Sequence, residues 1–442
     1  MRTTFFIVCA SLAAAAACAS SSEDGEAAPV DHGPSTVLAD AATSDVATDA
    51  GPDAEPELPR CSAAGWCTTS LPDSDLIMKD IWPLKTHAFA VAESATLGVK
   101  VLEWDEVADE WNYIDDDTQN EIGSGKYVGS IWAPNQDEVY YAVEPGIIYR
   151  GKRPVPPATE WSWTRQRLPD NSHKGDASHD PAHDHGYPFY QELKSNYPAL
   201  GVWGTGSDDV YAWYSNTIFR WKSEDGGAPA WVAEYVAADE EAYDEHLIIL
   251  SAGGRRGDVW FSGARDRGYG YNCALAVRKT SESYQRIADG IVHKFDVFNP
   301  CTERTGYLNI GGASGWLTDI QAAGTDRVVA LKGPRDVTQI SFEGGGYAIR
   351  SSTASNGPPS EVYYKAPVSF YSLWWAPENV WLSGWGLVVR GNSLVGDDSS
   401  YEVSTISLTG APLNRPMYRI RGTESTNLWA IGVRYALHKT TP

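Results

Sequence analysis

The stretch at residues 202–221, VWGTGSDDVYAWYSNTIFRW, decides the fold of this chain. It consists of an aromatic and small-residue run, a pair of acids, an alternating aromatic run, a polar turn, and a last alternating run that ends in Arg-Trp. Short runs that alternate with period two predict β-strands, and the Gly, Asp and Asn residues between them predict turns. The stretch therefore predicts short strands joined by tight turns.

The same pattern occurs seven times along the chain, mostly about 50 residues apart, with two longer intervals that indicate insertions. The units align on the hydrophobic residue after the polar turn, namely Ala88, Val139, Val210, Val259, Val328, Val380 and Leu428. An apolar run usually precedes this segment, and a third and often a fourth run follow it. Helical periodicity is nearly absent. The repeat predicts an all-β, seven-bladed β-propeller of four-stranded antiparallel blades.

The two ends of the repeat region predict how the ring closes. The last unit stops at Pro442 after its third run and lacks a fourth. The N-terminal run at residues 65–71, GWCTTSL, opens with Trp, as fourth runs of other units do. We therefore expect this N-terminal strand to complete the last blade and to cover an otherwise open sheet edge.

The units resemble the VWG-x-x-x-x-D-V-W-A-V-G … I-x-H-W-D-G repeats of predicted surface lipoproteins from myxobacteria-like bacteria. Those repeats are loosely related to sialidase-type and Asp-box propellers. The resemblance covers essentially residues 61–442. It implies the propeller fold and leaves the activity open, because propellers host many functions.

The segment before the repeats predicts export. In residues 1–18, Arg2 is followed by an apolar run too short to span a bilayer, which ends AAAC at Cys18. This end resembles a bacterial lipobox, in which Cys18 is lipidated; ordinary signal cleavage is the alternative, because residues 17–19 also fit an A-x-A site. Residues 19–60 carry ten carboxylates and few large apolar side chains, which predicts a disordered acidic Ala/Asp/Ser/Pro tether. We expect an outer-membrane or cell-surface lipoprotein, with the periplasmic side as the alternative.

The charge balance limits the partners. The chain of 442 residues has a net charge of -23, of which about -15 lies in residues 61–442. Nucleic acid and anionic membrane surfaces would repel such a protein. We expect a monomer that contacts the membrane only through its lipid anchor and binds a protein or glycan ligand at one face of the propeller.

Cysteine usage agrees with export. Cys9 lies in the signal and Cys18 is the lipidation candidate, so four cysteines remain, namely Cys61, Cys67, Cys273 and Cys301. Four cysteines allow three pairings, and proximity favours Cys61 with Cys67 and Cys273 with Cys301. A zinc site is the less favoured alternative, because the spacings lack the C-x₂-C pairs of zinc ribbons.

The first insertion, at about 169–199, is rich in histidine. Its four histidines are His173, His179, His183 and His185. Imidazole interleaved with aspartate suits a divalent metal such as Zn²⁺, Cu²⁺ or Ni²⁺. The favoured alternative is a polar loop that needs no cofactor, because Gly, Ser, Asp and Pro in this tract also mark a solvated loop.

The second insertion, at about 264–315, contains Cys273 and Cys301 and is predicted to be stapled by their disulfide. Its aromatic residues are candidates for a platform that binds a sugar or a peptide. The candidate ligand-binding residues are Tyr269, Tyr271, Phe295 and Phe298.

A basic residue occurs at matching offsets in the third run of five units. These residues are Arg150, Arg220, Arg278, Arg390 and His438. They could form an arginine cluster for a carboxylated sugar. A position repeated in five blades, away from the channel, is better explained by hydrogen bonds between blades to the Asp-bearing turns.

Nothing in the sequence assembles a known catalytic motif. The favoured function is therefore a non-enzymatic binding module on the cell envelope. The alternatives are a glycan-processing hydrolase of the sialidase or glycosidase type, and a metal-binding surface protein. A channel filled by Trp and Ile would favour the binding module, whereas two carboxylates or a basic cluster beside an acid in a deep channel pocket would favour the hydrolase.

Overall fold

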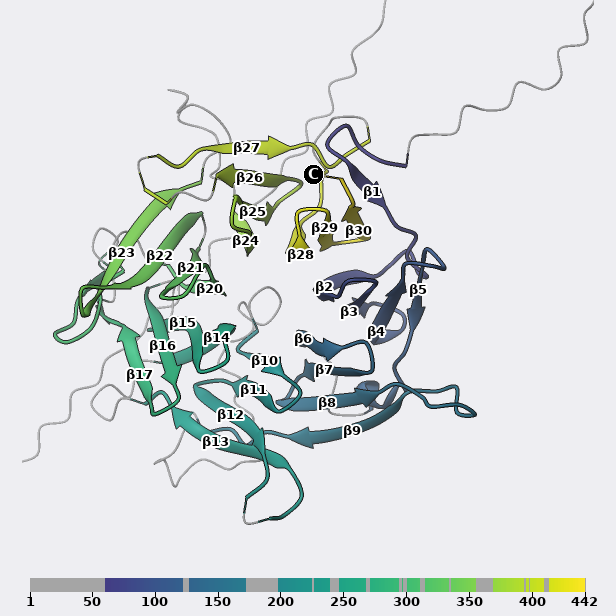
Figure 1. Ribbon diagram of the computed structural model, residues 1–442, viewed down its shortest axis with the longest axis horizontal. Coiled ribbons are helices and arrows are strands. Elements are labelled where there is room, and N and C mark those ends of the chain that lie inside the picture. Colours follow the sequence, from purple (N-terminus) through teal and green to yellow (C-terminus); the bar gives the residue numbers. More distant parts are fainter. Residues whose placement is uncertain are drawn as a thin grey trace, which may run out of the picture. The chain divides into compact units, whose positions relative to one another are not determined.

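The alternating runs form four-stranded antiparallel sheets, each of which is one blade of a propeller (Figure 1). We number the blades 1 to 7 in chain order. Blades 1 to 3 consist of β2 (Ile77–Pro83), β3 (His87–Ser94), β4 (Gly98–Asp105) and β5 (Glu110–Tyr113); β6 (Val128–Asn135), β7 (Glu138–Val143), β8 (Ile147–Lys152) and β9 (Ser162–Arg167); and β10 (Leu200–Gly206), β11 (Asp209–Tyr214), β12 (Thr217–Lys222) and β13 (Ala230–Val236).

Blades 4 to 7 follow the same order. They consist of β14 (His246–Arg255), β15 (Asp258–Asp266), β16 (Asn272–Thr280) and β17 (Tyr284–Ala288); β20 (Leu317–Ala322), β21 (Arg327–Lys332), β22 (Asp336–Glu343) and β23 (Gly346–Thr353); β24 (Phe370–Trp375), β25 (Asn379–Gly384), β26 (Val388–Asn392) and β27 (Tyr401–Ser404); and β28 (Met417–Glu424), β29 (Asn427–Gly432), β30 (Tyr435–Lys439) and β1 (Trp66–Thr68). A small extra sheet pairs β18 (Gly290–Val292) with β19 (Cys301–Glu303). The 3-10 helix η1 (Thr118–Asn120) follows blade 1.

This computed structural model describes residues 60–121, 127–171, 198–224, 226–238, 246–267, 271–293, 296, 300–310, 315–333, 335–354, 369–392, 395–396, 398–408 and 413–441. The predicted signal, the tether and Cys18 lie outside these ranges. Within them, no helix is long and apolar enough to cross a lipid bilayer.

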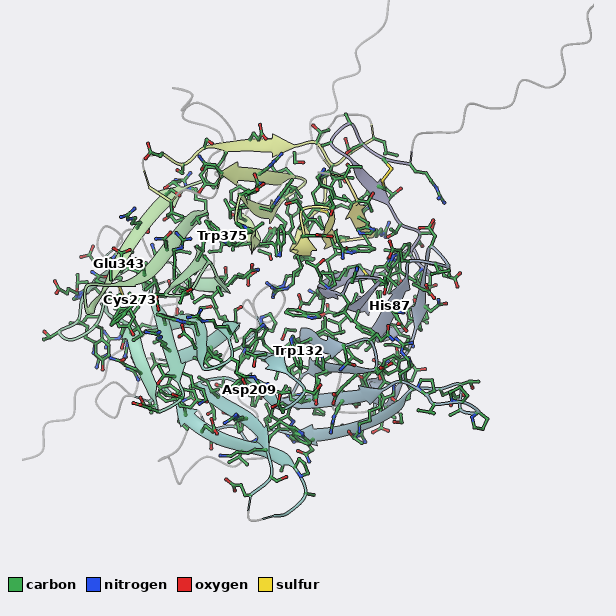
Figure 2. The ribbon with its side chains drawn as sticks, viewed as in Figure 1. His87, Trp132, Asp209, Cys273, Glu343 and Trp375 are labelled. Atoms are coloured by element: carbon green, nitrogen blue, oxygen red, sulfur yellow. A yellow bond between two sulfur atoms is a disulfide. The ribbon has the colours of Figure 1, made fainter. Side chains whose placement is uncertain are left out.

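The blades form a closed ring because each sheet has two apolar faces to bury. The inner strand of each blade contacts the inner strand of the next, and β28 of blade 7 contacts β2 of blade 1. One cluster of buried apolar side chains fills each of the seven interfaces between neighbouring blades. In Figure 2, Trp132 lies near the ring centre, whereas Glu343 lies at the outer rim. The predicted seven-bladed propeller is confirmed.

The N-terminal strand closes the ring, as the sequence predicts. β1 pairs with β30 in antiparallel register, with Cys67 opposite His438. The Trp66 side chain is fully buried, and its indole N–H donates to Ser404 Oγ of blade 6 at 2.9 Å. The strand therefore completes blade 7 and also packs against blade 6. A disulfide joins Cys61 to Cys67 at its start.

The repeated basic residue has a structural role inside its own blade. In five blades it stacks on an aromatic ring of the second strand and hydrogen-bonds the polar residue at the start of that strand. The hydrogen-bonded pairs are Arg150 with Glu138 (2.6 Å), Arg220 with Asp209 (3.0 Å), Arg278 with Asp258 (2.6 Å), Arg390 with Asn379 (2.8 Å) and His438 with Asn427 (3.0 Å).

The expectation that these bonds run between blades is wrong. In each case the basic residue lies opposite the aromatic residue in the antiparallel register, as Arg390 lies opposite Trp381. Side chains two apart on a strand share a face, so the polar residue of the second strand is within reach in the same sheet.

His438 makes the closing blade sensitive to acid. Its ring stacks on Trp429 with centroids 4.0 Å apart, and burial lowers the pKa of the imidazole to about 4. The unfolded chain takes up this proton at its ordinary pKa of 6.5, so the stabilisation is complete above that pH and is lost as the pH falls toward 4.

We expect the His438→Arg variant to lose less stability than the wild type between pH 6.5 and pH 4. The arginine would pair with Asn427 as Arg390 pairs with Asn379 in blade 6. It is charged in both the folded and the unfolded chain over this pH range. Urea unfolding across this pH range measures the difference, and equal pH slopes for both proteins would contradict it.

Candidate functional site

The two ends of the ring differ in what they carry. Because the strands of a blade alternate in direction, the hairpins that join strands one to two and three to four lie at one end, here called the hairpin face. The two-to-three hairpins and the connections from blade to blade lie at the other end, here called the connection face. Both predicted insertions begin and end at the connection face, since one joins β9 to β10 and the other lies in the β15–β16 hairpin and the connection from β17 to β20. Variable loops on a rigid scaffold are the usual place for binding residues.

Most residues predicted for these insertions lie outside the described ranges. This holds for His173, His179, His183 and His185, and for Tyr269, Phe295 and Phe298. Tyr271 is described: it is partly buried, and its carbonyl accepts the backbone N–H of Arg267 at 3.1 Å. In the part of the chain that the structure describes, no three His, Cys, Asp or Glu side chains are placed to hold a metal ion.

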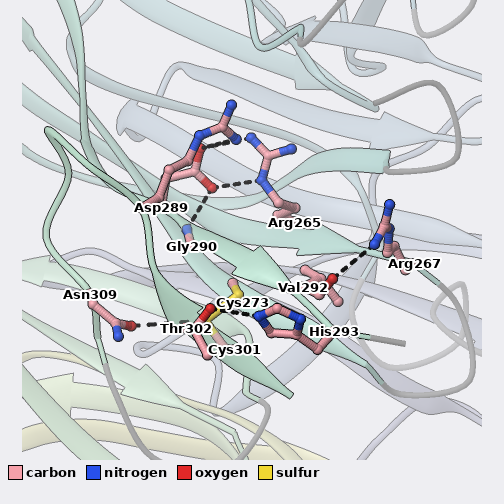
Figure 3. The surroundings of a disulfide bond; sticks show 11 residues. Arg265, Arg267, Cys273, Asp289, Gly290, Val292, His293, Cys301, Thr302 and Asn309 are labelled. Atoms are coloured by element: carbon pink, nitrogen blue, oxygen red, sulfur yellow. Dashed lines mark hydrogen bonds and ion pairs between the residues drawn. A yellow bond between two sulfur atoms is a disulfide. The ribbon is translucent and has the colours of Figure 1, made fainter. Parts of the chain in front are cut away.

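The second insertion is fixed by a disulfide and a buried ion pair, which Figure 3 shows. Cys273 of β16 is bonded to Cys301 of β19, so both predicted cysteine pairs are joined. Gly290 lies against this bond: a Cβ there would be 2.5 Å from the Cys301 sulfur and 2.6 Å from the Cys273 sulfur. Only glycine fits this position.

The carboxylate of Asp289 is the centre of the ion pair. It accepts two bonds from the Arg265 guanidinium, Nε to Oδ1 at 2.8 Å and Nη2 to Oδ2 at 2.7 Å, and both residues are fully buried. Arg286 and Arg304 also contact Oδ2, at 3.0 and 3.4 Å. Burial alone would raise the pKa of Asp289, but the bonds and charge of Arg265, with Arg286, hold it below its usual value. This cluster joins β15 to the segments on either side of the β18–β19 sheet.

A second feature of the connection face arises from bulges in the inner strands. In six of the seven blades, one extra residue interrupts the pairing of the inner strand with the second strand at the same place. By this register the extra residues are Lys79, Leu250, Thr318, Tyr371 and Tyr418, and in blade 2 either Gly129 or Ser130. In blade 3, β10 pairs regularly at this position. A bulge bends its strand and re-aims a side chain, and bulges are frequent beside functional sites.

In three consecutive blades the bulge residues contact one another. The Lys79 ammonium lies 4.9 Å from the centre of the Tyr418 ring, and the Tyr418 ring meets Tyr371 edge-on with centroids 5.6 Å apart. Lys79 also pairs with Glu93 of β3 at 3.3 Å. Burial raises the pKa of Glu93 against the opposing effect of Lys79. Trp385, which is 57% exposed, is bridged through its backbone to Pro416, two residues before Tyr418. We call these five residues, Lys79, Glu93, Tyr371, Trp385 and Tyr418, the channel-mouth arc.

After the bulge residues on the inner strands comes a layer of paired charges, which crosses the channel. Arg419 lies 3.0 Å from Asp80 of blade 1 and 3.5 Å from Asp319 of blade 5. Arg421 lies 3.6 and 3.7 Å from the same two carboxylates. Both aspartates are buried, at 1% and 0% exposure. We call these four residues the charged layer.

Asp80 and Asp319 of the charged layer, together with other polar side chains, also satisfy backbone groups at the inner edge of the ring. The inner strand of each blade has an edge with backbone N–H groups that need acceptors. Polar side chains of the preceding blade supply them, as in the bonds of Ile131 to Asp80 (3.0 Å), Val202 to Ser130 (2.7 Å), Leu373 to Asp319 (3.2 Å) and Trp375 to Gln321 (2.9 Å).

Trp and Ile in the channel would favour a binding module, and carboxylates beside a basic cluster would favour a hydrolase; the channel has features of both. Trp82, Trp203 and Trp213 line a small pocket here, but Asp80, Arg419 and Arg421 line it as well. The Arg421 guanidinium lies 5.7 Å from the centre of the Trp82 ring. The centre of the ring therefore combines aromatic packing with paired charges.

The residues of the channel-mouth arc were not predicted from the sequence as a site. The signal that could have found them is variation between the units. At the position before the bulge the inner strands have only apolar residues, such as Met78, Val128 and Met417. At the bulge itself the residue type changes from unit to unit.

Comparisons with known proteins support the fold. No family model and no curated protein matches this chain. A solved structure of YCF48 bound to D1 peptide is similar with a TM-score of 0.52 and 12% identity, covering 88% of this chain and 99% of that chain. YCF48 from Cyanidioschyzon merolae is similar with a TM-score of 0.52 and 13% identity, covering 84% of this chain and 98% of that chain. At this identity the likeness concerns the fold: this chain is a seven-bladed propeller of the same architecture.

Proposed function

We propose that this chain is a non-enzymatic binding module of the cell envelope, exported and anchored through a lipid on Cys18, that holds a polypeptide partner on its connection face. The observation that carries the proposal is the channel-mouth arc. Bulge residues of blades 6, 7 and 1, whose types differ from those of the other blades, meet at the face where both insertions begin and end. Residues that follow the repeat build the scaffold, so those that break it are the candidates for recognition.

The state of the channel carboxylates favours binding over catalysis. Asp80 and Asp319 are buried, lie beside two arginines and accept backbone N–H groups of the next blade. Carboxylates held in this way have a structural role in the ring, because they supply acceptors to its backbone. The similar YCF48 structure contains a bound D1 peptide, which supports a polypeptide as the class of partner.

Site-specific cross-linking tests the binding face. A photoreactive amino acid at Trp385 on the connection face is expected to cross-link a partner protein in intact cells. The matched control is Phe342, an aromatic residue of 40% exposure near the end of β22 at the hairpin face. Equal cross-linking from both positions, or cross-linking from Phe342 alone, would place the binding surface elsewhere.

Membrane fractionation tests the anchor. The Cys18→Ala variant is expected to move the protein from the membrane fraction to the soluble fraction, because the propeller itself offers no apolar membrane helix among its described residues. A variant that remains fully in the membrane fraction would contradict lipidation at Cys18.

A glycan-processing hydrolase is the second candidate, because Arg419 and Arg421 lie beside Asp80 in a channel pocket. Release of chromophore from chromogenic glycosides by the purified protein would favour it. No release, together with cross-linking from Trp385, would favour the binding module.

A further inference from the structure

We propose that the channel-mouth arc recognises a basic segment of the partner, with a lysine or arginine side chain placed against the Tyr371–Tyr418 pair. This inference rests on the proposed function and specifies the chemistry of the bound polypeptide.

The arc is specific to one sector of the ring. Its bulge residues come from blades 6, 7 and 1, where the side chains are Tyr371, Tyr418 and Lys79. At the same position blades 4 and 5 have Leu250 and Thr318, which are buried at 5% and 2% exposure. Tyr371 and Tyr418 are only partly buried, and Trp385, whose backbone is bridged to Pro416, is mostly exposed. This sector thus has two partly buried tyrosines and one mostly exposed tryptophan.

The chemistry of the arc favours a cation. The face of an aromatic ring carries partial negative charge and attracts an ammonium or guanidinium group. The Lys79 ammonium already occupies such a position over Tyr418. This contact shows that the Tyr418 ring attracts an ammonium group.

The charges around the arc disfavour an acidic ligand. Lys79 pairs with Glu93, and Arg419 and Arg421 pair with Asp80 and Asp319. The basic side chains here therefore already have carboxylate partners, and the arc and the charged layer together are neutral.

The net charge of the whole propeller also favours a basic ligand. Residues 61–442 contain 33 of the 35 Lys and Arg residues and 48 of the 58 Asp and Glu residues, a balance of -15. This field attracts a basic segment at long range, and added salt screens the attraction.

Two matched peptide libraries test the inference with the full chain. Both have the same apolar flanking positions; one has Lys and Arg at its central positions and the other Asp and Glu. The basic library is expected to be enriched on the immobilised protein, and its best peptide should bind more weakly at high salt in fluorescence anisotropy. We expect Tyr371→Ala and Trp385→Ala each to weaken that binding about tenfold. Tyr371→Phe, which keeps the ring, and Phe342→Ala on the hairpin face should leave it within about twofold.

The outcomes separate this inference from the proposed function. Circular dichroism first confirms that each variant is folded. If Tyr371→Ala is not folded, the peptide affinities of Trp385→Ala and Tyr371→Phe still test the inference. Enrichment of the acidic library, or basic binding unaffected by Trp385→Ala, would overturn the basic preference, while cross-linking from Trp385 would still support a partner on this face. Enrichment of neither library, with binding to a glycan array instead, would overturn both.

Discussion

A chain that begins at residue 72 is expected to melt far below the full protein. The deletion removes β1, exposes the edge of β30 and empties the site of Trp66, a fully buried residue that packs edge-on against Trp381 with centroids 5.9 Å apart. Loss of a buried Trp side chain alone costs about 3–5 kcal/mol of unfolding free energy. The exposed edge of β30 can also pair with a strand of another chain, which promotes aggregation. Thermal and urea unfolding followed by circular dichroism measure the effect.

The matched control separates the strand from its disulfide. In the double variant Cys61→Ser/Cys67→Ser, β1 and Trp66 remain, and only the cross-link of a short loop is lost, which costs about 2 kcal/mol. We therefore expect this variant to melt between the full protein and the deletion. An unchanged melting temperature of the deletion would refute closure of the ring by β1.

The Asp289→Ala variant is expected to lose about 3–5 kcal/mol of unfolding free energy, because it removes the carboxylate from a fully buried arginine. Arg265 directs two hydrogen bonds at Asp289, and Arg286 and Arg304 bring further positive charge to the same oxygen. Without the carboxylate these like charges repel one another in a site with little water. Urea unfolding at neutral pH measures the loss.

The control for this variant is an ion pair of the same type at the surface. Asp208 pairs with Arg256, and their side chains are 73% and 59% exposed. Water and salt screen that pair, so Asp208→Ala should leave the melting temperature nearly unchanged. Similar losses for both variants would mean that burial does not set the strength of the Asp289 cluster.

The sequence alone predicted the architecture because the propeller is a local design repeated seven times. Each unit has its own alternating strands and turns, and Gly, Asp and Asn mark the turns within a few residues of each strand. The closure of the ring could also be predicted from the sequence, since the last unit lacks a fourth run and residues 65–71 supply one. The role of the repeated basic residues as scaffold was foreseen, but their partners were placed in the wrong blade, because the sequence does not give the strand register.

The candidate site could not be predicted in this way. Lys79 and Tyr418 are more than three hundred residues apart in the chain and meet only because β28 lies beside β2 in the closed ring. The charged layer likewise joins Asp80, Asp319 and Arg419 from three blades.

The sequence by itself thus determined the all-β repeat, the number of blades and the strand that closes them, since strand alternation and turn residues act over a few neighbours. Only the tertiary structure decided which residues stand at the channel mouth. No particular residue type marks the bulges in the sequence. The closed ring also brings together residues that are far apart in the chain, and the sequence pattern around one of them does not predict the other. The repeat in residues 202–221 builds the scaffold, and the departures from it at Tyr371, Tyr418 and Lys79 mark the candidate site.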